Sequence, residues 1–382
     1  MGLLVALGGA AAGCASRPSG PLASSGPPLR VEVHPIIVTP SEATTEPELA
    51  ARGERALMEQ RWGDAADTYR TLVAAGASPE HAPEYLFDLA LALEGSQARL
   101  EAREAFLAVV RRFPEGPRAR SALVRAASLD AYLEDWKALA AIGDALLARS
   151  DLEDVDRIVG LGSRGLARVE LGDDMGASKD IFDGLEVADE LHYGARDVLP
   201  VAVAQLRFAL GELRRTRSER ITFDPLPPDF VAKLEERCGG LLEAQAAYAL
   251  AVRSIDPHWA AMSGYRVGEM YRTLHKTLVQ IPPPAASRTE KQKQIFYAFM
   301  HVRYRVLLEK GLREFDQTVA LGERTNDSSA WIQRAREAKD EMDTALADEK
   351  SQIGRMPFTE AEIHAALDVL QKKTATRPER AR

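Results

Sequence analysis

From residue 46 onward, apolar residues recur every three to four positions, and runs in which apolar and polar residues alternate are almost absent from the middle of the chain. This spacing places apolar side chains on one face of a helix, whereas a half-buried strand requires alternation. Two long stretches, "DVLPVAVAQLRFALGELRRT" and "DFVAKLEERCGGLLEAQAAYALAVRSID", fit the helical spacing well. They are separated by "RSERITFDPLPP", whose prolines break helices. The pattern therefore predicts an all-α protein.

Small and large apolar residues recur at fixed spacing in the first half of this region. A small residue is followed 12 positions later by alanine and, four positions after that, by a large apolar residue. This arrangement resembles the tetratricopeptide repeat (TPR), in which small residues let two antiparallel helices pack closely at a period of about 34 residues. The resemblance extends over residues 46–346 and implies an α-solenoid of TPR-like helix pairs, irregular toward the C-terminus. The sets are Gly53, Ala65 and Tyr69; Ala90, Ala102 and Phe106; Ala138 and Ile142 in a third unit; and Gly165, Ala177 and Ile181.

The stretch "DRIVGLGSRGLARVELG" places Gly160, Gly162 and Gly165 at the spacing of a dinucleotide-binding loop. Such a loop requires a preceding apolar strand and helix N-terminal amide groups directed at phosphate. The preceding "DLEDVDRIV" is rich in acids that favour a helix, and Gly165 lies 12 positions before Ala177, as the small residue does in the other repeats. We therefore expect Gly165 to pack helices together, and we expect no cofactor.

Later repeats match less closely. Gly268 and Tyr271 have the repeat's spacing in "GYRVGEMYRTLHKTL", and the second half of that unit is expected at Gly311 and Phe315. Between the two halves we expect an insertion that starts with "IPPPAASRTEKQKQ". The final helix, "AWIQRAREAKDEMDTALADE", is charged on most of its surface, as the cap of an open stack of repeats must be.

The N-terminal stretch "MGLLVALGGAAAGCAS" is too short to span a hydrocarbon layer of about 30 Å and is typical of a signal-peptide core. Its "AAGC" resembles the bacterial lipobox, which implies cleavage before Cys14 and a lipid on that cysteine. Ala15 after the cysteine implies the outer membrane, by the sorting rule of such lipoproteins. We expect a signal peptide at 1–13, a lipid anchor and Pro/Ser/Gly tether at 14–45, regular repeats at 46–194, irregular repeats with a capping helix at 195–349, and a tail at 350–382.

Charge and chemistry exclude several functions. The net charge of −8 argues against a nucleic-acid surface, because binding phosphates requires concentrated Lys and Arg. Cys238 lacks a second thiol for zinc and is expected to be a small buried residue. The acidic runs are typical of solvated helix faces, and no catalytic triad is found, so we expect neither an enzyme nor a small-molecule substrate. No metal site is expected, because no two histidines form a helical H-x-x-x-H pair; they stand at 34, 81, 192, 258, 275, 301 and 364.

Aromatic residues are concentrated in "QIFYAFMHVRYRVLL". Ile295, Phe299, Val302 and Val306 form one stripe at helical spacing, which must be buried against something. One interpretation is the core of the C-terminal repeats. The other is a contact with a partner protein, for which the candidate residues are Ile295, Phe296, Phe299, Met300 and Tyr304.

Taken together, the repeats and the lipobox resemble TPR lipoproteins of the outer membrane. Such proteins include the BamD-like scaffolds of envelope assembly and the repeat lipoproteins of gliding-motility complexes, and the motifs do not separate these two groups. The resemblance implies a non-enzymatic scaffold that faces the periplasm, is held to the membrane by its N-terminal lipid and binds other envelope proteins. The alternative is a TPR regulator of an envelope enzyme such as a peptidoglycan hydrolase or synthase.

Overall fold

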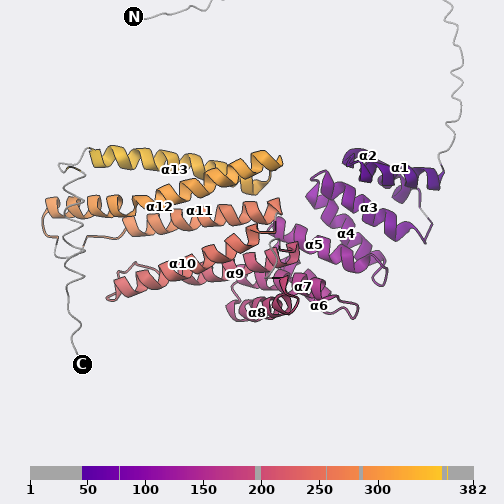
Figure 1. The fold of residues 1–382 in the computed structure, drawn as a ribbon, viewed down its shortest axis with the longest axis horizontal. Coiled ribbons are helices and arrows are strands. Elements are labelled where there is room, and N and C mark those ends of the chain that lie inside the picture. Colours follow the sequence, from indigo (N-terminus) through magenta and orange to yellow (C-terminus); the bar gives the residue numbers. More distant parts are fainter. Residues whose placement is uncertain are drawn as a thin grey trace, which may run out of the picture. The chain divides into compact units, whose positions relative to one another are not determined.

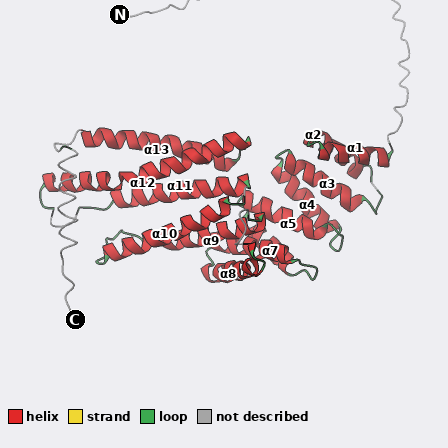
Figure 2. Cartoon of the chain, in the orientation of Figure 1, coloured by secondary structure: helices red, strands yellow, loops and turns green. Residues whose placement is uncertain are grey.

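The computed structural model describes residues 45–76, 78–193, 199–254, 256–283, 287–354 and 359. Within these residues it contains 13 helices and no strand, which confirms the all-α prediction (Figures 1 and 2). None of the described helices combines the length and the apolar character that crossing a membrane requires. The expected signal peptide, the lipid-bearing Cys14, the tether up to residue 44 and most of the tail lie outside the described residues.

The first eight helices form four antiparallel pairs, each joined by a turn of three residues, and every helix packs against the next one along the chain. This succession of contacts is that of an α-solenoid of TPR-like pairs. Alanine and glycine at the contacts allow the close packing, as the sequence predicted. The helices are α1 Glu46–Met58, α2 Trp62–Ala74, α3 Ala82–Gly95, α4 Arg99–Arg112, α5 Ala119–Tyr132, α6 Trp136–Leu147, α7 Asp154–Glu170 and α8 Asp174–Glu190.

A left-handed backbone conformation ends the first helix of each pair. It occurs at Gln60, Gln97, Glu134 and Gly172, with φ of 56°, 64°, 57° and 87°. These residues are 37, 37 and 38 positions apart. The expected 34-residue period is therefore wrong for this chain. Its repeats are longer because six or seven residues connect one pair to the next through the first four pairs.

The third pair lies one residue out of the predicted register. Counted from Glu134, the position of the packing alanine is occupied by Leu139, which is fully buried, and not by Ala138. The large apolar position is occupied by Gly143 instead of Ile142. A side chain on Gly143 would meet Arg164 Cβ at 2.9 Å, because α6 and α7 approach each other closely at this point. The register was mispredicted because the large and the small residue are exchanged here.

The three glycines of the apparent dinucleotide loop lie inside the continuous helix α7, and all three are buried. A Cβ built on Gly165 would lie 2.8 Å from Cγ1 of Ile181 in α8. The same close approach occurs in the first repeat, where a Cβ on Gly53 would lie 2.8 Å from the ring of Tyr69. The prediction that Gly165 packs two helices together is confirmed.

Longer helices follow in the second half of the chain. Helix α9 packs on α7 and α10, α11 packs on α12, and α13 packs on α12 and α11 (Figure 1). The two expected repeat halves pack against each other, since a Cβ on Gly268 of α11 would lie 2.6 Å from the ring of Phe315 in α12. The residues between them comprise the proline segment and the first half of α12, which is one continuous helix of 36 residues. It begins in a capping box in which the Thr289 hydroxyl accepts from the Gln292 amide, so only the proline segment before it is a loop. The bounds are α9 Val201–Glu219, α10 Phe230–Val252, α11 Pro257–Val279, α12 Glu290–Thr325 and α13 Ala330–Gly354.

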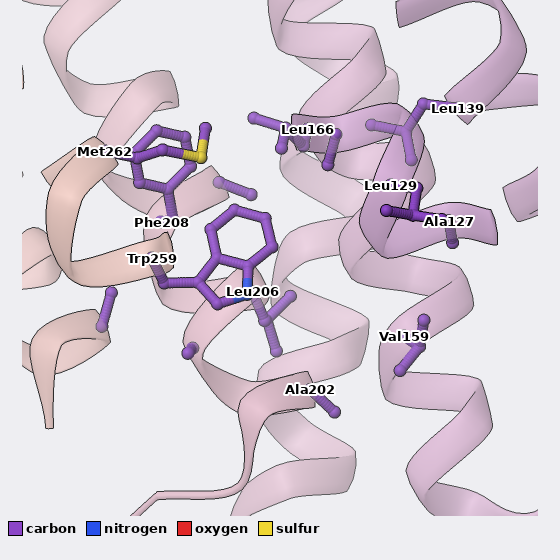
Figure 3. Close-up of a cluster of buried hydrophobic side chains, with 14 of the residues drawn as sticks. Ala127, Leu129, Leu139, Val159, Leu166, Ala202, Leu206, Phe208, Trp259 and Met262 are labelled. Atoms are coloured by element: carbon purple, nitrogen blue, oxygen red, sulfur yellow. The ribbon is translucent and has the colours of Figure 1, made fainter. Parts of the chain in front are cut away.

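An aromatic cluster joins the repeats to these longer helices (Figure 3). Trp259 and Met262 of α11 and Phe208 of α9 are almost fully buried, and the rings of Phe208 and Trp259 are 5.5 Å apart. They gather beside Leu206 of α9 and Leu166 of α7, which are fully buried. Because aromatic side chains bury large areas, this cluster makes the C-terminal helices continuous with the core of the repeats.

Candidate peptide-binding groove

A groove of about 780 Å³ opens along the first repeat and the start of the second. Helix α1 supplies one wall through residues spaced three or four positions apart, and α3 supplies the opposite wall, with Tyr69 of α2 between them. Repeat stacking creates such grooves without the need for a reaction, because the first helices of successive pairs face the same side. The lining residues are Glu46, Pro47, Ala50, Ala51, Glu54, Leu57, Met58, Tyr69, Ser78, His81, Glu84, Tyr85 and Asp88.

The groove is acidic. The described residues that line it include four carboxylates and no Lys or Arg. One of the four, Glu84, is paired with Arg118, which directly precedes α5 and whose Nε donates to Glu84 Oε2 at 2.7 Å. Glu54 projects from α1 and is exposed. The groove therefore attracts positively charged side chains.

Asp88 is a groove carboxylate whose charged form is disfavoured by burial. Burial, followed by the charge of Glu84, raises its pKa to about 6, although a hydrogen bond with Tyr69 and the charge of Arg118 lower it in part. Burial and the neighbouring Asp88 likewise raise the pKa of Tyr69. A Lys or Arg placed beside Asp88 would stabilise its ionised form.

Apolar contact area is available beside these charges. Met58 is 78% exposed at the end of α1 and lines the groove together with the partly buried Leu57. Methionine adapts to different partners because its side chain is unbranched and flexible. The groove is thus suited to a peptide segment with both apolar and basic side chains. Its lining also includes Ser78 and His81, whose Oγ and Nδ1 atoms are 2.9 Å apart, with Glu46 Oε1 3.4 Å from the same imidazole nitrogen. No local signal in the sequence indicates this groove, because its walls come from two repeats.

The aromatic stripe of α12 divides between core and surface. Met300 and Val302 are buried, Phe296, Phe299 and Tyr304 are partly buried against the core, and Ile295 is 37% exposed. Val306, at the end of the stripe, is also exposed. A partner contact at this stripe stays a prediction, and Ile295 and Val306 are its accessible members.

A buried acid cluster joins α7, α9, α10 and α11. The fully buried Glu212 accepts from Arg215 Nη2 at 2.5 Å and from the Tyr248 hydroxyl at 2.5 Å, and Arg266 Nε lies 3.0 Å from it. Burial, followed by the charge of Glu212, raises the pKa of Glu170 to about 8. Because Glu212 and Tyr248 are enclosed and Glu212 is paired with Arg215 and Arg266, this cluster holds helices together.

Two of the seven histidines, which are far apart in the sequence, lie together in the structure. His275 of α11 and His301 of α12 meet Glu349 of α13, and their ligand atoms lie within 4.8 Å of one another. Sequence reasoning missed this cluster because its members are on three helices, 26 and 48 residues apart. No local spacing motif could have indicated it.

No protein-family model matches this chain, and no curated protein sequence is similar to it at a significant level. Among solved structures, the chain is similar to a tetratricopeptide repeat protein from Parabacteroides merdae. The two are 13% identical, with a TM-score of 0.40, over 76% of this chain and 98% of that one.

Proposed function

We propose that this protein is a non-enzymatic, lipid-anchored scaffold of the bacterial cell envelope that holds a segment of another envelope protein in the groove between α1 and α3. The observation that carries the proposal is the groove itself, which combines an exposed methionine with four carboxylates on a helical-repeat fold. The segment it fits has apolar side chains to contact Met58 and a Lys or Arg to approach Asp88. The lipobox-like "AAGC" supports a membrane-tethered setting for this interaction, on the outer membrane and facing the periplasm.

A site-specific crosslinking experiment tests the groove. A photo-crosslinking amino acid is placed at Met58 in the full-length protein and, as a control, at Met175 of α8, which is 86% exposed and far from the groove. We expect the Met58 position to capture a defined envelope protein from intact membranes, and the Met175 position not to capture it. The identity of the captured protein decides between a structural complex and an envelope enzyme.

Charge reversal then tests the recognition chemistry. Glu54→Lys removes an exposed groove carboxylate, whereas Glu235→Lys makes the same change on an exposed part of α10. Capture at position 58 should fall several-fold with Glu54→Lys and stay unchanged with Glu235→Lys. Equal capture in both variants, or the same proteins captured from positions 58 and 175, would show that the groove is not the binding site.

The lipid anchor is tested separately. Cys14→Ser should abolish labelling by a fatty-acid analogue and release the protein from the membrane fraction. A mature lipoprotein carries several acyl chains, each contributing about 0.8 kcal/mol per buried methylene, so the unmodified protein should stay with the membranes. Sedimentation of the Cys14→Ser protein with membranes would mean that the anchoring is mediated by protein.

A further inference from the structure

Three side chains with metal-binding atoms converge where the last three helices pack together. His275 Nε2 lies 3.5 Å from one carboxylate oxygen of Glu349, and His301 Nδ1 lies 3.3 Å from the other. His275 and Glu349 are more than nine-tenths buried, at 8% and 5% exposed, and His301 is partly exposed. From this geometry we infer that the protein binds one divalent transition-metal cation, with Zn²⁺ as the best match, through His275, His301 and Glu349.

The polar atoms of the cluster are not satisfied by hydrogen bonds. His275 Nε2, His301 Nδ1 and Glu349 Oε1 are all buried, and none has a hydrogen-bond partner of acceptable geometry within the described residues. Buried polar atoms in native proteins are nearly always paired, because leaving them unpaired costs their full desolvation free energy. Here three such atoms face one another, which is the arrangement that a shared cation satisfies.

The separations match those of ligands on one ion. Zn²⁺ binds imidazole nitrogen and carboxylate oxygen at about 2.0–2.2 Å, so neighbouring ligand atoms of a tetrahedral ion lie about 3.3–3.5 Å apart. The two nitrogen–oxygen distances are 3.3 and 3.5 Å, each to a different oxygen of Glu349, and one ligand atom from each residue lies within 4.8 Å of the other two. A conventional hydrogen bond between the same groups would bring them to about 2.7–2.9 Å. The cluster is therefore spaced for coordination more closely than for direct pairing.

The donor set also selects the class of ion. Two imidazoles and a carboxylate suit zinc and its first-row neighbours, whereas Ca²⁺ and Mg²⁺ prefer oxygen ligands alone. Three protein ligands leave the fourth position of a tetrahedral ion for water, and His301 is partly exposed to solvent. Because each ligand comes from a different helix, the ion would tie the end of α13 to α11 and α12, and its binding would stabilise this part of the fold.

Metal titration of the full-length protein in detergent tests the inference, after chelation and removal of the chelator. Calorimetry should show one Zn²⁺ per chain, Co²⁺ should give the visible absorption of a tetrahedral nitrogen and oxygen site, and Zn²⁺ should raise the melting temperature. Glu349→Gln and His275→Gln should each weaken Zn²⁺ binding by more than about 100-fold, because substituting residues that only support the metal ligands already costs roughly 10- to 100-fold. Both variants should also lose the rise in melting temperature on adding Zn²⁺.

The matched control is His192→Asn, which removes an exposed histidine outside the cluster and should leave all three signals unchanged. Circular dichroism verifies that each variant is folded. If His275→Gln does not fold, the Zn²⁺ affinity of Glu349→Gln, which keeps the side-chain shape, tests the inference. Absence of stoichiometric Zn²⁺ and Co²⁺ binding would overturn the inference and leave the cluster as a histidine–carboxylate ion pair. Binding that survives in both cluster variants would overturn it equally.

Discussion

Gly165→Ala measures how tightly α7 packs against α8. The new Cβ would lie 2.8 Å from Cγ1 of Ile181 and 3.5 Å from Cβ of Asp180. Carbon atoms in contact normally stay about 3.5–4.0 Å apart, so something must move. Ile181 has little freedom to do so, because it is fully buried and its β-branched side chain has one strongly preferred rotamer in a helix.

Two effects oppose each other in this variant. Alanine in a helix interior is more favourable than glycine by about 0.5–1 kcal/mol, whereas overpacking a core costs about 1–3 kcal/mol. Overpacking therefore exceeds the helix-propensity gain, and we expect a net loss of about 1–2 kcal/mol. Gly239→Ala is the matched control, since Gly239 lies within α10 with no atom within 4 Å of its Cβ position. That variant should gain about 0.5–1 kcal/mol.

Thermal unfolding of the two full-length variants, followed by circular dichroism, gives the comparison. In a chain of this size 1 kcal/mol corresponds to a melting-temperature change of roughly 1–2 °C. Gly165→Ala should melt below the unmodified protein, and Gly239→Ala slightly above it. Equal stabilisation of both variants would refute the close-packing argument. Loss of binding to NAD or ATP resin by Gly165→Ala, with no loss of stability, would restore the dinucleotide-loop interpretation.

The remaining predictions concern the buried acids and the aromatic stripe. The folded-state pKa of Glu170 is raised to about 8, so the folded protein holds a proton that the unfolded chain releases above about pH 4.5. This contribution to the free energy of unfolding is therefore present at low pH and is lost as the pH rises toward 8. Glu170→Gln should remove a pH dependence of the free energy of unfolding of at most about 1.4 kcal/mol per pH unit. Parallel curves of unfolding free energy against pH for the variant and the unmodified protein between pH 5 and 8 would contradict this. Met300→Ser should destabilise by about 2–5 kcal/mol because Met300 is buried, whereas Ile295→Ser, on the exposed edge, should change stability by less than about 0.5 kcal/mol. If Ile295→Ser lowers the melting temperature as much as Met300→Ser, the stripe is core along its whole length.

Much of the helical architecture could be predicted because its signals are local. Apolar spacing identifies a helix wherever it occurs, and a glycine 16 residues before a large apolar residue places the two opposite each other once a short turn joins their helices. Gly53 with Tyr69 and Gly165 with Ile181 are such pairs, and both contacts are present. Rejecting the dinucleotide loop required only these neighbours and the acids before Gly160.

Local signals were insufficient where the partner of a residue lies on a distant helix. The third repeat was misaligned because Leu139 and Gly143 exchange large and small residues, which only the close approach of α6 and α7 explains. The start of α12 was missed because the capping box at Thr289 was not recognised after the proline segment, although its residues are adjacent in sequence. The residues that separate the two repeat halves are therefore partly helical, since they include the first half of α12.

The candidate sites depended most on tertiary structure. Periodicity determines which face of a helix is apolar, but it does not determine which residues of two long helices lie level with each other, because sliding one helix along another preserves the pattern. The meeting of His275, His301 and Glu349 is decided by how α11, α12 and α13 align, and the groove with Glu54 and Asp88 is decided by how two repeats stack. The sequence alone determined that the chain forms helical repeats; the packing of those helices decided where charged and metal-binding side chains come together.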